Sequence, residues 1–238
     1  MYLLPEIAHV WQYSMKKEEF PLYLEEVQRL KEKYRDQIVV RVASEVDFYA
    51  SCFSEYKTAV RPYLDKMDYI LGSIHVVGPW ENTDAFGVDD DIGVEKCRQF
   101  GADKVYLEYY KGLEALVATG FYNILGHLDL PKKFGVLPET PDLVHEKVLT
   151  LLDLIAKSDM SVEINMAGLL KPVKEQYPSG KIIEEMIARK ISINLGSDSH
   201  KPHNVGYQFE EMLRKLQKMG LTHLCKWEKR EKTLIPIK

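Results

Sequence analysis

The stretch SINLGSDSHKP, residues 192 to 202, passes directly from apolar alternation into small and polar residues. Its apolar start favours a strand covered on both faces, and Gly196 begins the polar part. In an extended chain Asp198 and His200 would point to the same side, so that a carboxylate oxygen and an imidazole nitrogen could bind one cation. An ordinary turn is the alternative, because Ser and Asp often follow Gly in turns.

Other short apolar runs also end on polar or ionisable residues. Glu45 follows the first run, His75 the second and His127 the third, while Glu163 and Asn165 lie in the fourth. The runs are QIVVRVASEVDFY (37–49), DYILGSIHVV (68–77), FYNILGHLDL (121–130) and SVEINMAG (161–168). The opening residues of the chain complete this series of predicted strands.

Helical patterns separate these runs, and an alternation of strands and helices predicts an α/β fold with a parallel sheet. In a closed parallel barrel the carboxyl ends of all strands meet at one face, where active sites form. Glu45, His75, His127, Asp198 and His200 are therefore expected to converge. The predicted helices are 18–34, 55–66, 90–119 with a break near Gly101, 139–158, 180–190 and 203–219.

Each of these residues has a simpler interpretation. Glu45 could pair with a basic residue on the rim, and a lone histidine such as His75 is often only hydrogen-bonded. Asp129 could cap a helix or support a histidine ligand. Glu163 could line the barrel or support a ligand, and Asn165 could donate to the substrate.

Composition narrows the class of protein. The chain has 238 residues, 45% of them hydrophobic, and no linker divides it, so we expect one domain over residues 1–238. A net charge of −4 gives no reason to expect nucleic acid, and no segment is long and apolar enough to span a membrane. The three separated cysteines indicate reduced thiols. We therefore expect a cytoplasmic protein with a small-molecule partner.

Other catalytic schemes fit the sequence less well. It contains neither a G-x-S-x-G elbow nor a G-x-x-x-x-G-K-[ST] phosphate loop. Imidazole and carboxylate ligands without cysteine favour zinc, manganese or iron, and the composition does not choose among these metals.

Four motifs in register resemble the polymerase and histidinol phosphatase (PHP) superfamily, and specifically its histidinol-phosphate phosphatases. They are GSIH (72–75), GHLDLPKKFG (126–135), NMAGLLKPVKEQYPSG (165–180) and GSDSHKP (196–202). The resemblance implies a distorted seven-stranded (β/α) TIM-like barrel and up to three divalent metal ions. It also implies hydrolysis of histidinol phosphate, a small-molecule phosphate, in histidine biosynthesis.

The resemblance also implies roles for individual residues. Glu45 matches a glutamate that bridges two metals, and His75 and His127 match the histidines that complete one of these positions. Asp198 matches a ligand of a second metal and His200 a ligand of a third, so that Glu45, Asp198 and His200 are the catalytic candidates. The two candidates for phosphate binding are Lys171 and Lys201.

The sequence departs from the family at its beginning. Family members start with a strand that carries an H-x-H pair, which this sequence lacks, so we expect the first strand of the barrel to be missing. His9 is a weak candidate for a further ligand, because an ungapped alignment places Gln12 there. We expect fewer metals, impaired activity and a homodimer formed at the open edge. The alternatives are a phosphoesterase for another small phosphate and an inactive remnant that binds metal or phosphate.

Overall fold

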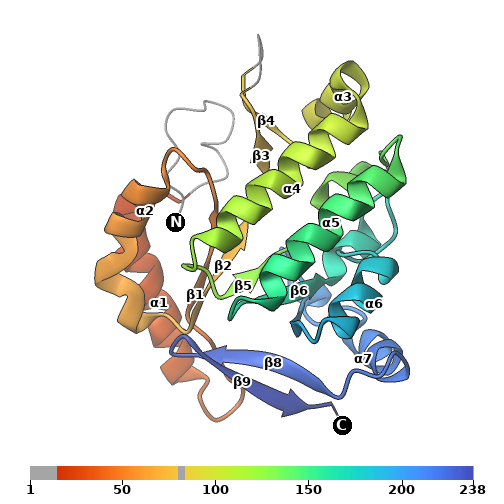
Figure 1. The fold of residues 1–238 in the computed structure, drawn as a ribbon. Coiled ribbons are helices and arrows are strands. Elements are labelled where there is room, and N and C mark those ends of the chain that lie inside the picture. Colours follow the sequence, from red (N-terminus) through yellow and green to blue (C-terminus); the bar gives the residue numbers. More distant parts are fainter. Residues whose placement is uncertain (1–14, 80–83, 238) are drawn as a thin grey trace.

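A five-stranded parallel sheet forms the centre of the fold (Figure 1). The computed structural model describes residues 15–79 and 84–237, so the predictions for His9 and for an opening strand lie outside the described residues. The strands follow the order β1-β2-β5-β6-β7, and every neighbouring pair is parallel. Their bounds are β1 Ala43–Asp47, β2 Tyr69–Ser73, β5 Ile124–Leu125, β6 Ser161–Asn165 and β7 Ser192–Gly196.

Helices connect these strands, as the alternation predicts, and α4, α5 and α6 lie side by side over one face of the sheet (Figure 1). The helical pattern 90–119 divides at Gly101, as expected. The α-helices are α1 Phe20–Lys33, α2 Phe53–Val60, α3 Asp91–Phe100, α4 Ala102–Ala118, α5 Pro141–Ala156, α6 Gly180–Ala188 and α7 Phe209–Lys218. The 3₁₀ helices are η2 Lys17–Glu19, η3 Arg61–Lys66, η4 Leu130–Phe134, η5 Met166–Leu170 and η6 Pro202–Asn204.

Strand β6 shows how the sheet separates apolar from polar side chains. Val162 and Ile164 are fully buried in the main hydrophobic core. The alternate residues, Ser161, Glu163 and Asn165, belong to the other face because side chains alternate along a strand. All three are buried as well. Polar side chains therefore line the inner face of the sheet, while helices cover the outer face.

The strands are shorter than the apolar runs that predict them. The run 37–49 becomes a strand only at Ala43, and Ile38 and Val39 before it are 61% and 70% exposed. Within residues 15–79 and 84–237 the parallel sheet has five strands rather than the seven that the resemblance implies. A separate antiparallel pair, β3 Val76–Val77 and β4 Phe86–Gly87, follows β2.

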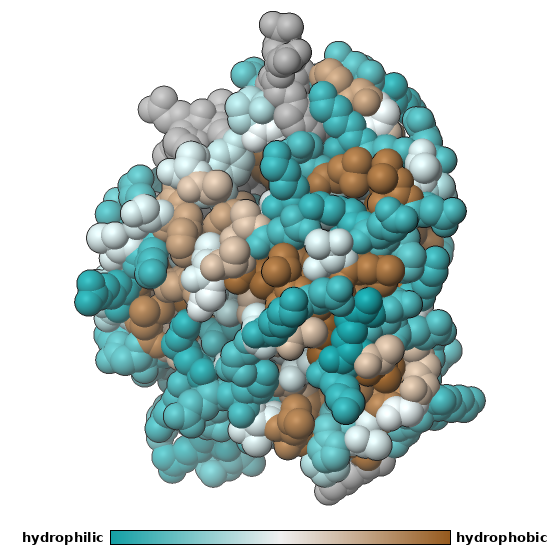
Figure 2. All heavy atoms as spheres, viewed as in Figure 1, coloured by the Kyte–Doolittle hydropathy of each residue, from teal (hydrophilic) through white to brown (hydrophobic). Residues whose placement is uncertain are grey.

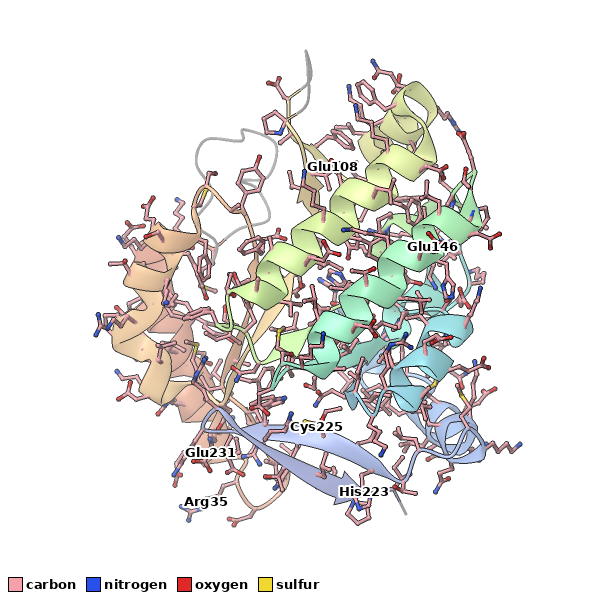
Figure 3. All side chains as sticks on the ribbon, in the orientation of Figure 1. Arg35, Glu108, Glu146, His223, Cys225 and Glu231 are labelled. Carbon is pink, nitrogen blue, oxygen red and sulfur yellow. The ribbon has the colours of Figure 1, made fainter. Side chains whose placement is uncertain are left out.

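A C-terminal hairpin that the sequence analysis missed packs against the start of the sheet. It consists of β8 His223–Glu228 and β9 Glu231–Pro236. Trp227 donates its indole N–H to Ser161 Oγ over 2.8 Å, and Asn194 donates to the carbonyl of Cys225 over 2.5 Å. Figure 3 labels Cys225 on β8, where it is buried. The hairpin thus covers the amino ends of the strands.

The helical face of the molecule is amphipathic. Figure 2 shows mostly hydrophilic side chains over this face, with apolar patches between them. No helix in the described part of the chain combines the length and the apolar character that a bilayer crossing demands.

Candidate metal centre

Glu45, His75 and His127 meet at the carboxyl ends of three neighbouring strands. Their potential ligand atoms all lie within 4.8 Å of one another. Glu45 Oε1 is 3.2 Å from His127 Nε2 and 3.9 Å from His75 Nε2, and the two imidazole rings are 4.7 Å apart between centroids. The structure therefore brings these three predicted residues together.

The register of the strands produces this convergence. Asp47 pairs with Ser73, which places the Ser73 hydroxyl beside Glu45. That hydroxyl donates to Glu45 Oε1 over 2.6 Å. Gly126 permits the next strand to approach closely, since a Cβ there would lie 2.7 Å from Leu71 Cδ2 and 2.9 Å from Ser73 Oγ. A larger residue at position 126 would push the loop that carries His127 away from the centre.

Asp47 orients His75 and was missed in the sequence analysis. Its Oδ1 accepts hydrogen bonds from the His75 backbone N–H over 2.8 Å and from Nδ1 over 3.0 Å. Partial burial opposes protonation of His75, but the carboxylates of Asp47, Glu45 and Asp89 outweigh it and raise the pKa of His75 to about 10. At neutral pH His75 Nε2 therefore carries a proton, which a cation bound through Nε2 would have to displace.

Glu45 and His127 form a charge-complementary pair. Burial opposes ionisation of Glu45, yet the hydrogen bond and charge of His127, with the charge of His75, hold the pKa of this carboxyl well below its usual range. Burial likewise opposes protonation of His127, whose pKa is nevertheless raised by Glu45. The buried His127 Nδ1 has no hydrogen-bond partner among the described residues. The ligand atoms of Glu45, His75 and His127 are nevertheless close enough together to bind one positive ion.

A second polar group lies beside the first, on β6 and after β7. The Asn165 amide donates to Glu163 Oε2 over 3.0 Å and to Asp198 Oδ2 over 3.2 Å. Glu163 Oε2 also accepts the backbone N–H of His127 over 3.3 Å. Burial of Glu163, opposed by His127 and reinforced by Asp198, raises the pKa of its carboxyl to about 7. Glu163 and Asn165 therefore support the centre.

The expectation that Asp198 and His200 point to the same side of an extended chain is wrong. Asp198 has a φ of +44°, which turns the chain after β7. His200 Nδ1 lies 4.0 Å from Asp198 Oδ1, and the His200 side chain is 88% exposed. The two residues remain neighbours, although only Asp198 faces the buried polar group.

The two lysines expected at the substrate phosphate lie in different surroundings. Lys171 follows η5 and is half-buried, whereas Lys201 precedes η6 and is exposed. Each backbone is held locally, since the N–H of Lys171 bonds to the carbonyl of Gly168 and that of Lys201 to the hydroxyl of Ser199.

Asp129 stands at the N-cap position of η4, as one reading of the sequence suggests, but its side chain makes no capping hydrogen bond there. Its Oδ2 accepts hydrogen bonds from Lys132 Nζ and from the N–H of Ser179, each over 2.9 Å. Lys132 is buried and also donates to Glu175 Oε2 over 2.7 Å and to the carbonyl of Gln176 over 2.8 Å. Asp129 and Lys132 thus fasten the loop after His127 to the loop after β6.

The donor set fits a divalent cation. Two ligands of a tetrahedral metal, each about 2.1 Å from it, lie about 3.4 Å apart. The measured separations from Glu45 Oε1, 3.2 Å to His127 and 3.9 Å to His75, bracket that value. Two imidazoles with one carboxylate suit zinc and similar borderline metals.

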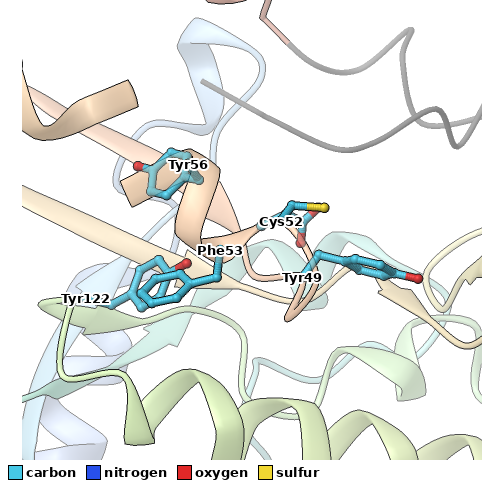
Figure 4. A pocket seen from close by; sticks show the side chains of 6 residues that line it. Tyr49, Cys52, Phe53, Tyr56 and Tyr122 are labelled. Carbon is cyan, nitrogen blue, oxygen red and sulfur yellow. The ribbon is translucent and has the colours of Figure 1, made fainter. Parts of the chain in front are cut away.

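A pocket that Asp47 also lines offers no such donor set. Its lining is mostly aromatic, and Figure 4 shows Tyr49, Cys52, Phe53, Tyr56 and Tyr122 around it. Asp47 is its only carboxylate, and Asp47 already accepts two hydrogen bonds from His75. The metal centre is therefore the stronger candidate for chemistry.

A parallel sheet with carboxylate and imidazole groups at its carboxyl edge defines a class of metal-dependent hydrolases. The chain belongs to the PHP domain family, whose model matches residues 6–167. It is 33% identical to the "Probable histidinol-phosphatase" of Deinococcus radiodurans over 208 residues, which cover 87% of this chain and 75% of that protein. It is 30% identical to the histidinol-phosphatase of Bacillus subtilis, with 81% and 75% covered.

A solved structure shares the fold. The crystal structure of histidinol phosphate phosphatase from Lactococcus lactis, complexed with Zn, L-histidinol and phosphate, matches with a TM-score of 0.70. The match covers 92% of this chain and 80% of that one, at 19% identity. This likeness agrees with the predicted α/β class and with a distorted TIM-like barrel.

Proposed function

We propose that the chain is a metal-dependent phosphatase that hydrolyses histidinol phosphate to histidinol and phosphate. The convergence of Glu45, His75 and His127 within 4.8 Å, in a chain of the PHP domain family, carries this proposal. The assignment of the substrate rests on the relatives. Those from Deinococcus and Bacillus bear the name histidinol-phosphatase, and the Lactococcus structure contains L-histidinol and phosphate.

Zinc is the cation we place first, with manganese and iron as the other metals that this donor set accepts. Glu45, His75 and His127 would hold it. When bound, such a cation polarises a phosphoryl oxygen and lowers the pKa of a bound water. Asp198 and His200 would serve further cations, of which the family resemblance implies up to three.

The protein's own groups prepare the site. Asp47 holds His75 through Nδ1, so that Nε2 is the nitrogen that would bind the cation once its proton is displaced. Ser73 donates to Glu45 and fixes the orientation of its carboxylate. Lys171 and Lys201 would attract the phosphate as point charges, without the bidentate fork that an arginine would offer.

The test measures phosphate release from histidinol phosphate and from a panel of unrelated phosphomonoesters, with the protein loaded with zinc or manganese. We expect a clear preference for histidinol phosphate. Glu45→Gln, which keeps the size of the side chain and removes its charge, should lower kcat at least 100-fold. Glu55→Gln, on the exposed face of α2, is the matched control and should retain the activity.

Two outcomes would overturn the proposal in different ways. Equal turnover of the whole panel would indicate a phosphoesterase of broad specificity. Uptake of metal without any turnover would indicate a protein that binds metal and does not hydrolyse this ester.

A further inference from the structure

Asn165, the last residue of β6, is 1% exposed and has all its polar groups bonded. Its backbone N–H and carbonyl pair with Tyr177 over 2.6 and 2.9 Å. Its Oδ1 accepts the N–H of Ala167 over 2.9 Å, while Nδ2 donates to Glu163 and Asp198. The side chain thus makes contacts separate from those of the backbone.

The orientation of this amide follows from its neighbours. If the amide were turned by 180°, Oδ1 would face two carboxylates and Nδ2 would face the N–H of Ala167. Both contacts would be repulsive, because each would place like partial charges together. With Nδ2 toward the carboxylates, its two hydrogens serve Glu163 and Asp198 at the same time.

Asn165 therefore joins the two halves of the centre. Glu163 accepts from the backbone of His127, so hydrogen bonds run from His127 through Glu163 and Asn165 to Asp198. Asp198 adopts a φ of +44°, which is uncommon for residues other than glycine, although aspartate tolerates it better than most. The hydrogen bond from Asn165 Nδ2 directs the carboxylate of Asp198 toward the buried polar group.

We propose that Asn165 is a positioning residue that holds the Asp198 carboxylate beside the Glu45, His75 and His127 cluster, ready to bind a cation there. A neutral amide suits this task because it orients Asp198 without cancelling its charge. A lysine or arginine would neutralise the carboxylate and compete with the cation. The inference rests on the proposed function, since it assigns Asp198 to the same metal centre.

The experiment is a double-mutant cycle with Asn165→Ala, Asp198→Ala and the double variant. The first readout is the number of zinc equivalents retained in equilibrium dialysis, and the second is kcat and KM for histidinol phosphate. The Asn165→Ala variant should retain fewer zinc equivalents, because the zinc that depends on Asp198 is lost. Its kcat should fall at least tenfold, with a smaller change in KM. In the Asp198→Ala background the same substitution should change either readout less than threefold.

Two further variants separate positioning from packing. Asn165→Asp has the same size but exchanges the donors for a carboxylate oxygen, so it should also lower kcat at least tenfold although it leaves no cavity. Asn194→Ala is the matched control on β7, because its amide bonds to the hairpin at Cys225. It should lower the unfolding temperature and leave kcat within threefold.

Equal effects of Asn165→Ala with and without Asp198 would overturn the inference and leave Asn165 a purely structural residue. Unchanged zinc retention in Asn165→Ala would do the same. The dialysis readout does not depend on the substrate, so the inference is tested even if the chain fails to hydrolyse histidinol phosphate.

Discussion

Asp47 Oδ1 accepts two hydrogen bonds from one residue, His75, over 2.8 Å from the backbone N–H and over 3.0 Å from Nδ1. The first bond fixes the loop after β2, and the second fixes the imidazole ring upon it. Because Nδ1 is engaged, Nε2 is the nitrogen left to face Glu45. Asp47 therefore decides which nitrogen of His75 is available to a cation.

Asp47→Ala should lower the affinity for zinc about 10- to 100-fold, because the ring loses its orientation and the ligand loses basicity. Equilibrium dialysis with metal analysis measures this change. Asp142→Ala, an exposed aspartate in α5, is the control for loss of one negative charge. Equal zinc affinity in Asp47→Ala and the control would contradict this account of His75.

Gly196→Ala should disturb the metal centre by displacing Glu163, which supports it. A Cβ at position 196 would lie 1.8 Å from Glu163 Oε1, so the buried carboxylate would have to move. We expect a loss of about 1–3 kcal/mol in the free energy of unfolding, together with reduced zinc retention. Denaturant unfolding and dialysis measure the two effects.

Gly180→Ala provides the matched comparison for that substitution. Its Cβ would meet only Lys215 Nζ at 3.7 Å, and position 180 is helical. This variant should be as stable as the parent or more stable by up to about 1 kcal/mol. If Gly196→Ala behaved in the same way, Glu163 would not be held where the structure places it.

Asp68 should make the stability depend on pH in the acid range. Burial opposes its ionisation, but the N–H groups of Val42 and Lys229 and the ammonium of Lys31 lower the pKa of this carboxyl. A depressed folded pKa means that the stabilisation is complete above the unfolded value, about 3.9, and is lost as the pH falls through the folded pKa.

Asp68→Asn should therefore cost stability at pH 7, and the difference from the parent should narrow below about pH 4. Urea unfolding at a series of pH values measures it. Asp65→Asn, at an exposed position in η3, should stay within about 0.5 kcal/mol of the parent throughout. A difference for Asp68→Asn that is constant down to pH 2 would refute the assignment.

Trp227→Phe should separate stability from metal binding. The substitution removes the hydrogen bond to Ser161 Oγ and leaves a buried hydroxyl without this partner, at a cost of about 1–2 kcal/mol. Ser161 begins β6, at the opposite end from Asn165, so zinc affinity should not change. A parallel loss of zinc would show that the hairpin and the centre are coupled.

The sequence predicts the convergence of Glu45, His75 and His127 because parallel strands present their carboxyl ends at one edge. It does not predict the pairing of Asp47 with His75, since that contact depends on the register of β1 against β2. Nor does it predict the two hydrogen bonds that Asn165 Nδ2 donates to Glu163 and Asp198. The parity argument for Asp198 and His200 fails because the positive φ of Asp198 bends the chain.

The C-terminal hairpin was missed for a different physical reason. Its turn places Lys229 and Arg230 at φ values of +50° and +63°. Two-residue hairpin turns of this kind usually carry Asn-Gly or Asp-Gly, so Lys-Arg gives no turn signal. Asp68 compensates by accepting the N–H of Lys229 through Oδ1 and that of Arg230 through its carbonyl.

Because β8 and β9 lie near the end of the sequence, the contacts of that hairpin can form only late in synthesis of the protein. Glu228 forms a two-pronged ion pair with Arg41, 187 residues earlier in the chain, over 2.9 Å at each prong. Until the ribosome has made residue 228, Arg41, which lies just before β1, has no access to this ion-pair partner. Contacts of such long sequence separation slow folding and leave early segments exposed to misassociation. A nascent chain halted before residue 223 should accordingly be far more sensitive to protease around Arg41 than the released protein.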